Sequence, residues 1–177
     1  MIKLGVLGAG GRMGRRIIEL ALNDKELEVI LALERKGHHL IGKNIDKVKI
    51  SSTPDGIFLA DAIIDFTIPE ASMENLAYVL QYKKPLVLAT TGFNEEQTAK
   101  IRDAAKSIAI VFSPNMSIGI NLLFDIVGEI AKKLGPGYDI EMVEAHHKAK
   151  KDAPSGTAKK LAQVIANDTA RIITVHA

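Results

Sequence analysis

Cysteine and tryptophan are both absent from the 177-residue sequence, and aromatic residues make up only 5% of it. Without cysteine the chain forms no disulfide and has no thiolate chemistry, which is typical of proteins in a reducing compartment. No apolar run approaches the roughly 18 residues that a membrane-spanning helix needs, and the N-terminus lacks the pattern of a signal peptide. We therefore expect a cytoplasmic protein with no membrane partner.

A strong charge of either sign is also missing. The sequence has 23 Lys and Arg against 21 Asp and Glu, which gives a formal net charge of +2. Such a weak overall charge gives no reason to expect nucleic acid as a partner, so any anion site must be local. The content of 47% hydrophobic and 25% charged residues is typical of globular proteins, and the length fits one large domain or two small ones.

Short apolar segments alternate with helical patterns along the first part of the chain. This alternation predicts βαβ units in a Rossmann-like, doubly wound parallel sheet, which we assign to a dinucleotide-binding domain of residues 1–113. Residues 38–54 fit the pattern poorly, and we expect a loop there with at most one edge strand near residues 48–50. The predicted strands are residues 2–7, 27–33, 62–66, 86–89 and 108–112, and the predicted helices are residues 12–22, 71–82 and 95–106.

A second, smaller α+β unit is predicted at residues 114–177. Its longest element is a helix over residues 118–134, which Gly135, Pro136 and Gly137 terminate. A strand over residues 140–145, a helix over 158–166 and a strand over 171–175 complete the pattern. Two strands and two helices make a poor core, because a strand pair leaves unpaired edges and an apolar face to cover.

A glycine-rich segment at residues 8–14, GAGGRMG, follows the first predicted strand and opens the first predicted helix. Glycine permits a tight turn there and lets a pyrophosphate approach the N–H groups at the helix start. Glu34 ends the second strand 20 residues beyond Gly14, where an acid accepts hydrogen bonds from the adenosine ribose, and Arg35 is suited to a 2′-phosphate. We predict a site for NADH or NADPH; the alternatives are a structural glycine turn and an ordinary surface arginine.

Polar residues follow two later strands, at the edge of the sheet where ligands of open α/β folds lie. Phe66 and Thr67 follow one strand, and Ala89, Thr90 and Thr91 follow the next. The threonine hydroxyls could face the nicotinamide, and Phe66 could lie against the cofactor rings. The alternative is that the threonines only cap loops before the helices.

Residues 144–157, EAHHKAKKDAPSGT, bring together two of the five histidines, three lysines and a helix-start signal. Ser155, Gly156 and Thr157 can offer hydroxyl and N–H groups to a carboxylate. Histidine can donate a proton near neutral pH, and the residue pattern alone favours His147 for that role. We therefore predict an acid–base and carboxylate-binding site.

Two other interpretations of this segment remain. A metal site could be formed from His146, His147, Glu144 and Asp152, but their spacing matches no familiar ligand set, and we expect no metal. The segment could also be a solvated basic turn before an ordinary helix.

Several motifs taken together resemble the 4-hydroxy-tetrahydrodipicolinate reductase family, formerly called dihydrodipicolinate reductase. They lie in order between residues 8 and 157: GAGGRMG at 8–14, LER at 33–35, DFT at 65–67, TTGF at 90–93, PNMSIGIN at 114–121, and the 144–157 segment. The resemblance implies an NADH- or NADPH-dependent reduction of a small cyclic dicarboxylate to tetrahydrodipicolinate, in the diaminopimelate route to lysine. It also implies a homotetramer. The alternatives to this activity are an inert or regulatory nucleotide-binding module and a reductase of the same fold that acts on another small dicarboxylate.

The resemblance also implies roles for residues that match the family motifs. His146 would be the proton donor and Lys150 its charged partner, in place of His147. The pyrophosphate would lie on Gly8, Gly11, Arg12 and Met13, the adenosine ribose on Glu34 and Arg35, and the nicotinamide on Thr67 and residues 89–91. The substrate would contact Thr91, His147, Ser155, Gly156 and Thr157.

Two departures from the family pattern stand out. The family usually has glycine where this chain has Ala89, and an extra methyl group there could crowd the cofactor or shift the loop. The family also continues beyond the position of Ala177 with further strands and a helix. We therefore expect a fragment or deletion form whose second unit is incomplete as a substrate-binding and oligomerisation domain.

Overall fold

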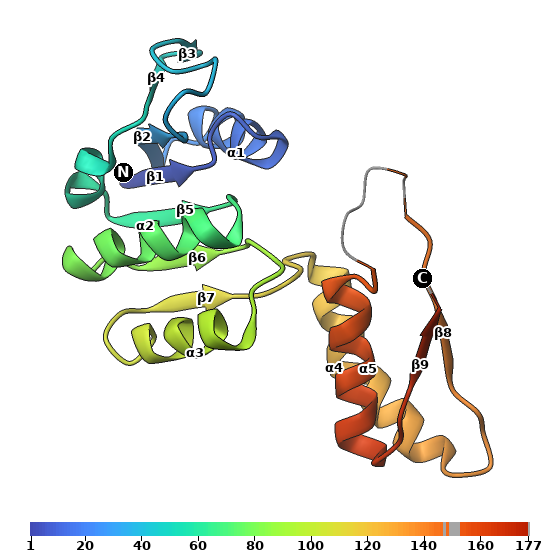
Figure 1. Cartoon of the computed structure of the whole chain (residues 1–177). Helices are drawn as coiled ribbons and strands as arrows, with labels where there is room; N and C mark the ends of the chain where they lie inside the picture. The colour runs from blue at the N-terminus through green and yellow to red at the C-terminus, as the bar shows by residue number, and fades with distance from the viewer. Residues whose placement is uncertain (147, 149–152, 177) are drawn as a thin grey trace. The chain divides into compact units, whose positions relative to one another are not determined.

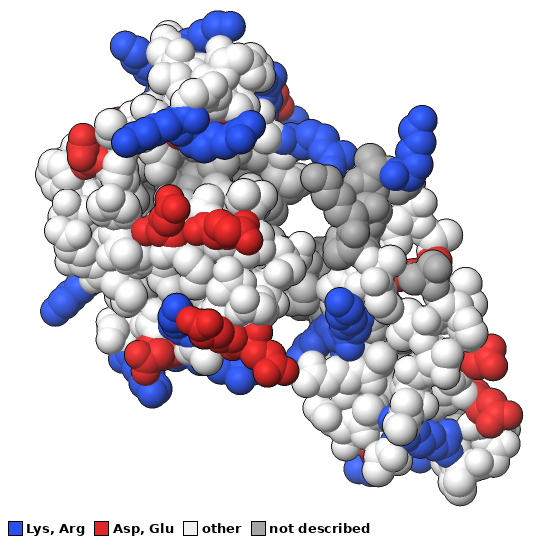
Figure 2. Space-filling view, in the orientation of Figure 1, with Lys and Arg blue, Asp and Glu red and all other residues white. Residues whose placement is uncertain are grey.

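The computed structural model describes residues 1–146, 148 and 153–176. These form two compact units, Met1–Phe112 and Ser113–Ala177, and each is described here by itself. No helix among the described residues is both long and apolar enough to cross a bilayer. Basic and acidic side chains both occur on the face of the first unit seen in Figure 2, in keeping with the near-neutral charge balance.

The first unit is a seven-stranded sheet with helices packed on it (Figure 1). The strand order is β3-β4-β2-β1-β5-β6-β7, and every neighbouring pair is parallel except β3 with β4. Without β3 this is the order of a dinucleotide-binding sheet, in which the strand order reverses beside β1. The strands are β1 (Ile2–Leu7), β2 (Leu27–Leu33), β3 (Asn44–Ile45), β4 (Val48–Ser51), β5 (Ala62–Asp65), β6 (Leu86–Leu88) and β7 (Ile110–Phe112).

Helices fill the connections between these strands. The α1 helix (Arg12–Leu22) joins β1 to β2, α2 (Pro69–Gln81) joins β5 to β6, and α3 (Glu95–Ala104) joins β6 to β7. A short 3-10 helix, η1 (Pro54–Leu59), precedes β5. The predicted Rossmann-like sheet is confirmed, and β1, β2 and α1 have the predicted bounds.

Two apolar clusters hold this unit together, one on each face of the sheet. The first packs α2, α3 and η1 against the sheet and includes the fully buried Ile57, Ile63 and Val79. The second packs α1 through Ile18 against Val6 and other residues of the sheet. Successive residues of a strand face opposite sides, so buried strands supply both clusters.

The segment 38–54 differs from the prediction. We expected a loop with at most one strand, whereas the structure has two strands, β3 and β4, paired antiparallel through Asn44 with Lys49 and Ile45 with Val48. Asp46, with φ of 51°, lies in the two-residue turn between them. The mostly polar sequence hid this hairpin, because only Val48 and Ile50 are buried within it.

The second unit consists of two helices and a two-stranded sheet. The α4 helix (Ile118–Leu134) packs on α5 (Gly156–Thr169), and β8 (Glu141–Val143) pairs parallel with β9 (Thr174–His176). α4 has the predicted bounds, and Gly135 ends it at a φ of 73°, a conformation that glycine adopts without strain. Phe124, Ala131, Ala158 and Ile165 are the buried hydrophobic residues of this unit among those described.

Candidate functional site

The glycine-rich segment forms a tight turn between β1 and α1. Gly8 has a φ of 77°, and its N–H and that of Ala9 both donate to the carbonyl of Leu33, at 2.9 and 3.1 Å. A Cβ on Gly8 would lie 2.6 Å from the carbonyl oxygen of Phe66, and one on Gly14 would clash with the carbonyl oxygen of Gly8. Only glycine fits at these two positions, so the turn leaves the start of α1 open to a phosphate.

Glu34 lies directly beside this turn. Its Oε2 accepts a hydrogen bond from the N–H of Gly10 at 2.9 Å, and its Oε1 accepts one from the N–H of Arg35 at 3.0 Å. The predicted ribose acid therefore also braces the glycine turn. The structure thus brings Glu34 and the glycine segment together, as expected from their spacing.

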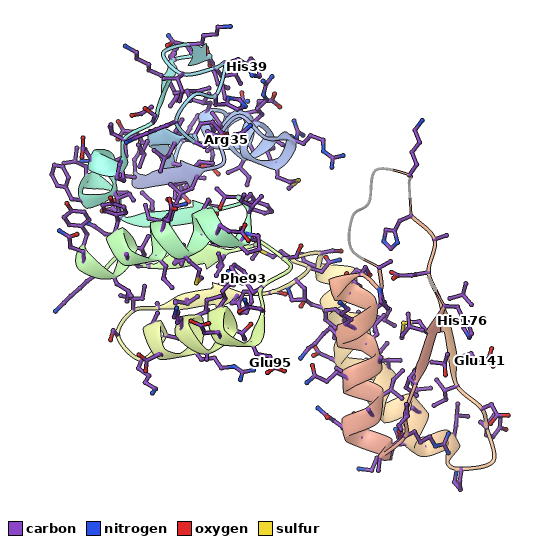
Figure 3. All side chains as sticks on the ribbon, viewed as in Figure 1. Arg35, His39, Phe93, Glu95, Glu141 and His176 are labelled. Carbon is purple, nitrogen blue, oxygen red and sulfur yellow. The ribbon has the colours of Figure 1, made fainter. Side chains whose placement is uncertain are left out.

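The basic residues around this turn are solvent-exposed. Arg35 follows β2 (Figure 3), and Arg12 begins α1. The neighbouring apolar Met13 is also 49% exposed. Arg15 was missed at the sequence level; its Nε donates to the carbonyl of Gly10 at 3.1 Å, so it faces the glycine turn. The helical spacing from Arg12 could have signalled it, since residues three apart share a face of a helix.

His38 was also missed. A Cβ on Gly10 would lie 2.7 Å from Cε1 of His38, which places this half-buried imidazole over the glycine turn beside Glu34. His39 (Figure 3) is exposed next to it. The centroids of the two imidazole rings are 4.5 Å apart. The only sequence signal was the pair of histidines four and five residues after Glu34.

The loops after β5 and β6 are joined by hydrogen bonds. The N–H of Thr67 donates to Oγ1 of Thr90 at 3.1 Å, and the N–H of Ala89 donates to the carbonyl of Asp65 at 3.0 Å. Phe66 and Thr67 are half-buried, Thr90 is only 3% exposed, and Thr91 is exposed. The predicted nicotinamide residues thus lie together, but the hydroxyl of Thr90 is occupied inside the protein.

Asp65 is the centre of this arrangement and was not singled out from the sequence. Its carboxylate is 1% exposed and accepts hydrogen bonds from Thr67, Asn75 and Thr90. Burial raises the pKa of Asp65, and the hydrogen bonds from Thr67 and Asn75 partly offset that rise. Its place in the DFT motif was a signal, but its partners are separated in sequence.

In the second unit, a carboxylate lies at the start of α5. Oε1 of Glu144 accepts a hydrogen bond from the N–H of Ser155 at 2.6 Å, and Oγ of Ser155 caps α5 by accepting from the N–H of Ala158 at 3.1 Å. Because the first N–H groups of a helix have no partner within it, this end of α5 favours negative charge. The bound carboxylate of Glu144 therefore indicates that the start of α5 suits a carboxylate group.

The remaining predicted residues of this segment are only partly described. Nδ1 of His146 lies 3.4 Å from Oε2 of Glu144, and the imidazole is 39% exposed. Oγ1 of Thr157 accepts a hydrogen bond from Nδ2 of Asn115 at 3.1 Å. His147, Lys150 and Asp152 lie outside the described residues. Among the residues that are described, no group of three or more His, Asp or Glu side chains could hold a metal ion.

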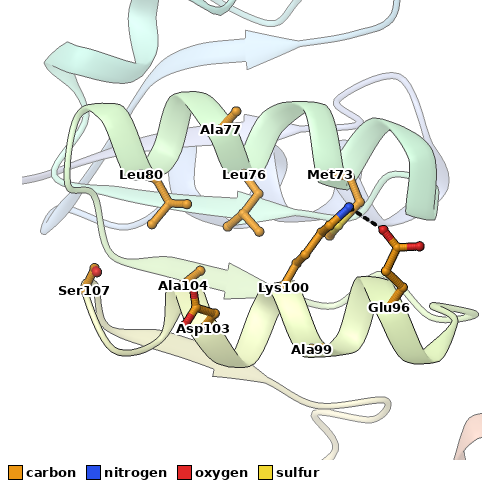
Figure 4. A pocket seen from close by; sticks show the side chains of 10 residues that line it. All are labelled: Met73, Leu76, Ala77, Leu80, Glu96, Ala99, Lys100, Asp103, Ala104 and Ser107. Carbon is orange, nitrogen blue, oxygen red and sulfur yellow. Dashed lines mark hydrogen bonds and ion pairs between the residues drawn. The ribbon is translucent and has the colours of Figure 1, made fainter.

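A hollow of about 620 Å³ between α2 and α3 contains none of the predicted site residues (Figure 4). Its floor includes Leu76 and Leu80, and an exposed ion pair between Glu96 and Lys100, at 2.7 Å, lies on its rim. The adjacent Lys100 lowers the pKa of Glu96. None of the residues that line this hollow is predicted to bind cofactor or substrate.

Family models match almost the whole chain. Residues 2–116 match the N-terminal part of dihydrodipicolinate reductase, and residues 119–177 match its C-terminal part. The chain belongs to the dihydrodipicolinate reductase family. The predicted family, and with it the predicted oxidoreductase class, is therefore confirmed.

Curated relatives agree with this family. The 4-hydroxy-tetrahydrodipicolinate reductase of Citrifermentans bemidjiense is 39% identical over 97% of this chain and 67% of the relative. That of Rubrobacter xylanophilus is 41% identical over 97% of this chain and 66% of the relative. The chain thus spans about two thirds of the length of these family members.

Solved structures show the same fold. A dihydrodipicolinate reductase from Paenisporosarcina sp. TG-14 with dipicolinate bound has a TM-score of 0.74 and 29% identity, over 94% of this chain and 66% of that one. An NAD-binding protein from Listeria innocua has a TM-score of 0.57 and 20% identity, over 82% of this chain and 45% of that one, which supports the fold alone.

Proposed function

We propose that the chain catalyses the NADH- or NADPH-dependent reduction of 4-hydroxy-tetrahydrodipicolinate to tetrahydrodipicolinate, a step of lysine and diaminopimelate biosynthesis. The observation that carries this proposal is the match of curated reductases over 97% of the chain at about 40% identity. In this proposal residues 1–113 bind the cofactor, and residues 114–177 bind the substrate and associate with other copies.

The residues of the first unit fit a dinucleotide. Gly8 and Gly14 shape the turn at the start of α1, where a side chain would fill the space that the backbone needs. Gly11, Arg12 and Met13 would hold the pyrophosphate, and Glu34 and Arg35 the adenosine ribose. Phe66, Thr67, Ala89, Thr90 and Thr91 would hold the nicotinamide end, which supplies a hydride when the cofactor is bound.

The residues of the second unit fit a dicarboxylate. The start of α5 already accepts the carboxylate of Glu144, and Ser155, Gly156 and Thr157 begin this helix. His147 and Thr91 would add substrate contacts, as the family resemblance implies. The bound dipicolinate of the Paenisporosarcina relative, itself a cyclic dicarboxylate, is consistent with such a ligand.

His146 would donate the proton that completes the reduction. Its Nδ1 lies 3.4 Å from Oε2 of Glu144, which orients the ring with Nδ1 toward that carboxylate and Nε2 away from it. Lys150 would supply a second positive charge near the substrate. A positioned general acid typically contributes about 10²- to 10⁴-fold to the rate.

We also propose that the chain is a cytoplasmic homo-oligomer. Support comes from α4, where Ile118, Leu122, Ile126 and Ile130 are exposed by 88, 58, 42 and 51%. Contiguous apolar surface of this kind commonly marks a protein interface. Light scattering at several protein concentrations would test it, and a monomer throughout would contradict it.

The activity is tested by mixing the chain with NADH and the product of the preceding synthase, and following absorbance of the reduced nicotinamide. We expect substrate-dependent loss of this absorbance, with kcat about 10²-fold lower in His146→Gln and unchanged NADH affinity. His176→Gln, which changes another exposed histidine of the second unit, is the matched control. Binding of NADH without any turnover would instead indicate an inert nucleotide-binding module.

A further inference from the structure

Asp65 is a buried carboxylate that accepts four hydrogen bonds. Its Oδ1 accepts from the N–H of Thr67 at 2.9 Å, from Oγ1 of Thr67 at 2.6 Å and from Oγ1 of Thr90 at 3.3 Å. Its Oδ2 accepts from Nδ2 of Asn75 at 3.3 Å. Among the described residues no Lys, Arg or His forms an ion pair with it, so hydrogen-bond donors alone stabilise its charge.

These bonds fix the direction of the hydroxyl protons. When Asp65 is ionised, Thr67 and Thr90 are the donors toward it, because a hydroxyl has one proton and an ionised carboxylate has none. Ser72 then directs its own proton to Thr90 or Thr67, since Oγ of Ser72 lies 2.9 Å from each Oγ1. The carbonyl of Ile68, 3.4 Å from Oγ1 of Thr67, is a weaker competitor than a carboxylate oxygen at 2.6 Å.

The direction of these protons determines which hydrogen bonds the hydroxyl of Thr67 can form at the carboxyl end of the sheet. Thr90 is buried at 3% exposure, whereas Thr67 is half-buried at the carboxyl end of β5, where ligands of this fold lie. With its proton committed to Asp65, Oγ1 of Thr67 can accept a hydrogen bond from a ligand but cannot donate one. Asp65 also ties the neighbouring strands β5 and β6 together, because its carbonyl accepts from the N–H of Ala89 at 3.0 Å (Figure 1).

We infer that Asp65 is a positioning residue that holds Thr67 as a hydrogen-bond acceptor and so selects a cofactor whose pyridine ring carries a donor, the NH₂ of the carboxamide. This inference rests on the proposed function, because it requires the nicotinamide to approach Thr67. Ser72 and Asn75 support Asp65 in this role through their hydrogen bonds within the network.

The inference is tested by calorimetric titration of the whole chain with three reduced dinucleotides. They are NADH, an analogue with an acetyl group in place of the carboxamide, and a thioamide analogue that keeps the NH₂. We expect the acetyl analogue to bind roughly 2- to 10-fold more weakly than NADH, the value of one neutral hydrogen bond. The thioamide analogue should bind within about 2-fold of NADH.

Substitutions at Asp65 and Thr67 test whether the difference in affinity between NADH and the acetyl analogue depends on Asp65. Thr67→Val removes the acceptor, and Asp65→Ala frees the hydroxyl of Thr67 to donate, so both should bind NADH and the acetyl analogue within about 2-fold of each other. Asp65→Asn keeps an acceptor oxygen and should restore the preference for NADH. Asp61→Ala is the matched control, because Asp61 accepts from the N–H of Lys3 at 2.8 Å, immediately before β5 at its opposite end.

ADP-ribose, which lacks the pyridine ring, shows whether each variant is folded, and it should bind all of them within about 2-fold of the unmodified chain. If Asp65→Ala fails this check, Thr67→Val and Asp65→Asn decide. Equal affinity of the unmodified chain for NADH and the acetyl analogue, or full discrimination in Thr67→Val, overturns the inference and leaves the reductase proposal standing. If NADH binds more tightly than the acetyl analogue but the chain does not reduce the dicarboxylate, only the reductase proposal is contradicted. If the chain does not bind NADH, both proposals are contradicted.

Discussion

The two units of this chain differ in how they bury apolar side chains. The first has a buried apolar cluster on each face of its sheet, and further partly buried apolar residues pack against both clusters. The second leaves Ile118, Val143 and Ile172 exposed by 88, 77 and 97%. A Rossmann-like sheet with helices on both faces can carry its own core, whereas two helices beside a strand pair leave apolar surface that needs further cover. The first unit is therefore expected to be the more independent of the two.

The largest expected effect is a contrast between two helical isoleucines. Ile101 on α3 is 2% exposed and Ile130 on α4 is 51% exposed. We expect Ile101→Ala to lower the free energy of unfolding by about 2–5 kcal/mol, because it leaves a cavity, and Ile130→Ala by about 0.5 kcal/mol or less. Urea denaturation followed by circular dichroism measures both. Equal losses would show that the second unit is as well packed as the first.

A smaller effect concerns the choice of cofactor in the first unit. Arg35→Ala should weaken NADPH binding by about 1.5–3 kcal/mol and NADH binding much less, because only NADPH carries the 2′-phosphate that a guanidinium contacts. Arg102→Ala, which removes an exposed cation from α3, is the control. Titration with each cofactor is the measurement, and an equal loss for both would reject this role of Arg35.

The helix caps offer a matched pair across the two units. Oδ1 of Asn94 accepts from the N–H of Gln97 at 2.8 Å at the start of α3. Oγ of Ser155 accepts from the N–H of Ala158 at 3.1 Å at the start of α5. Replacing either with Ala should cost about 1 kcal/mol. Amide hydrogen exchange should rise more in α5 of Ser155→Ala than in α3 of Asn94→Ala, because fewer buried contacts hold the second unit. Unchanged exchange in α5 of Ser155→Ala would contradict this.

The smallest effect is the pH dependence contributed by Asp65. Because burial raises the pKa of Asp65 in the folded protein, the folded state binds this proton more tightly than the unfolded chain. Its stabilising contribution is full below the ordinary value of about 3.9 and is lost as pH rises through the folded pKa. The unmodified chain should therefore lose stability relative to Asp65→Asn as the pH rises above about 4 and through the raised pKa of Asp65. A constant difference in urea midpoint across this range would contradict the assignment.

Strong local patterns predicted much of the fold. β1, β2, α1 and α4 have the predicted bounds, because apolar spacing and the glycine stops define them within the sequence. α2 begins at Pro69, two residues earlier than predicted, although proline at the first helical position was a visible signal. η1 and the β3–β4 hairpin were missed because short elements carry too few residues to show a period.

The candidate site was predictable where it depends on spacing and not where it depends on packing. Glu34 and the glycine turn meet as their separation in sequence suggested. The network of Asp65, Ser72, Asn75 and Thr90 was not foreseen, because its members come from β5, α2 and the loop after β6 and meet only when the strands pair. Burial of Thr90 likewise depends on α2 packing over the loop.

In the proposed function, the first unit holds the cofactor along the glycine turn and the ends of β2, β5 and β6. Titration of NADH into the chain, with backbone amide chemical shifts recorded at each step, tests this position of the cofactor. We predict saturable changes at residues 8–14, 34–38, 66–67 and 89–91, and none of comparable size in the hollow between α2 and α3. Absence of binding, or shifts centred on Leu76, Leu80 and Lys100 of that hollow, would contradict the account.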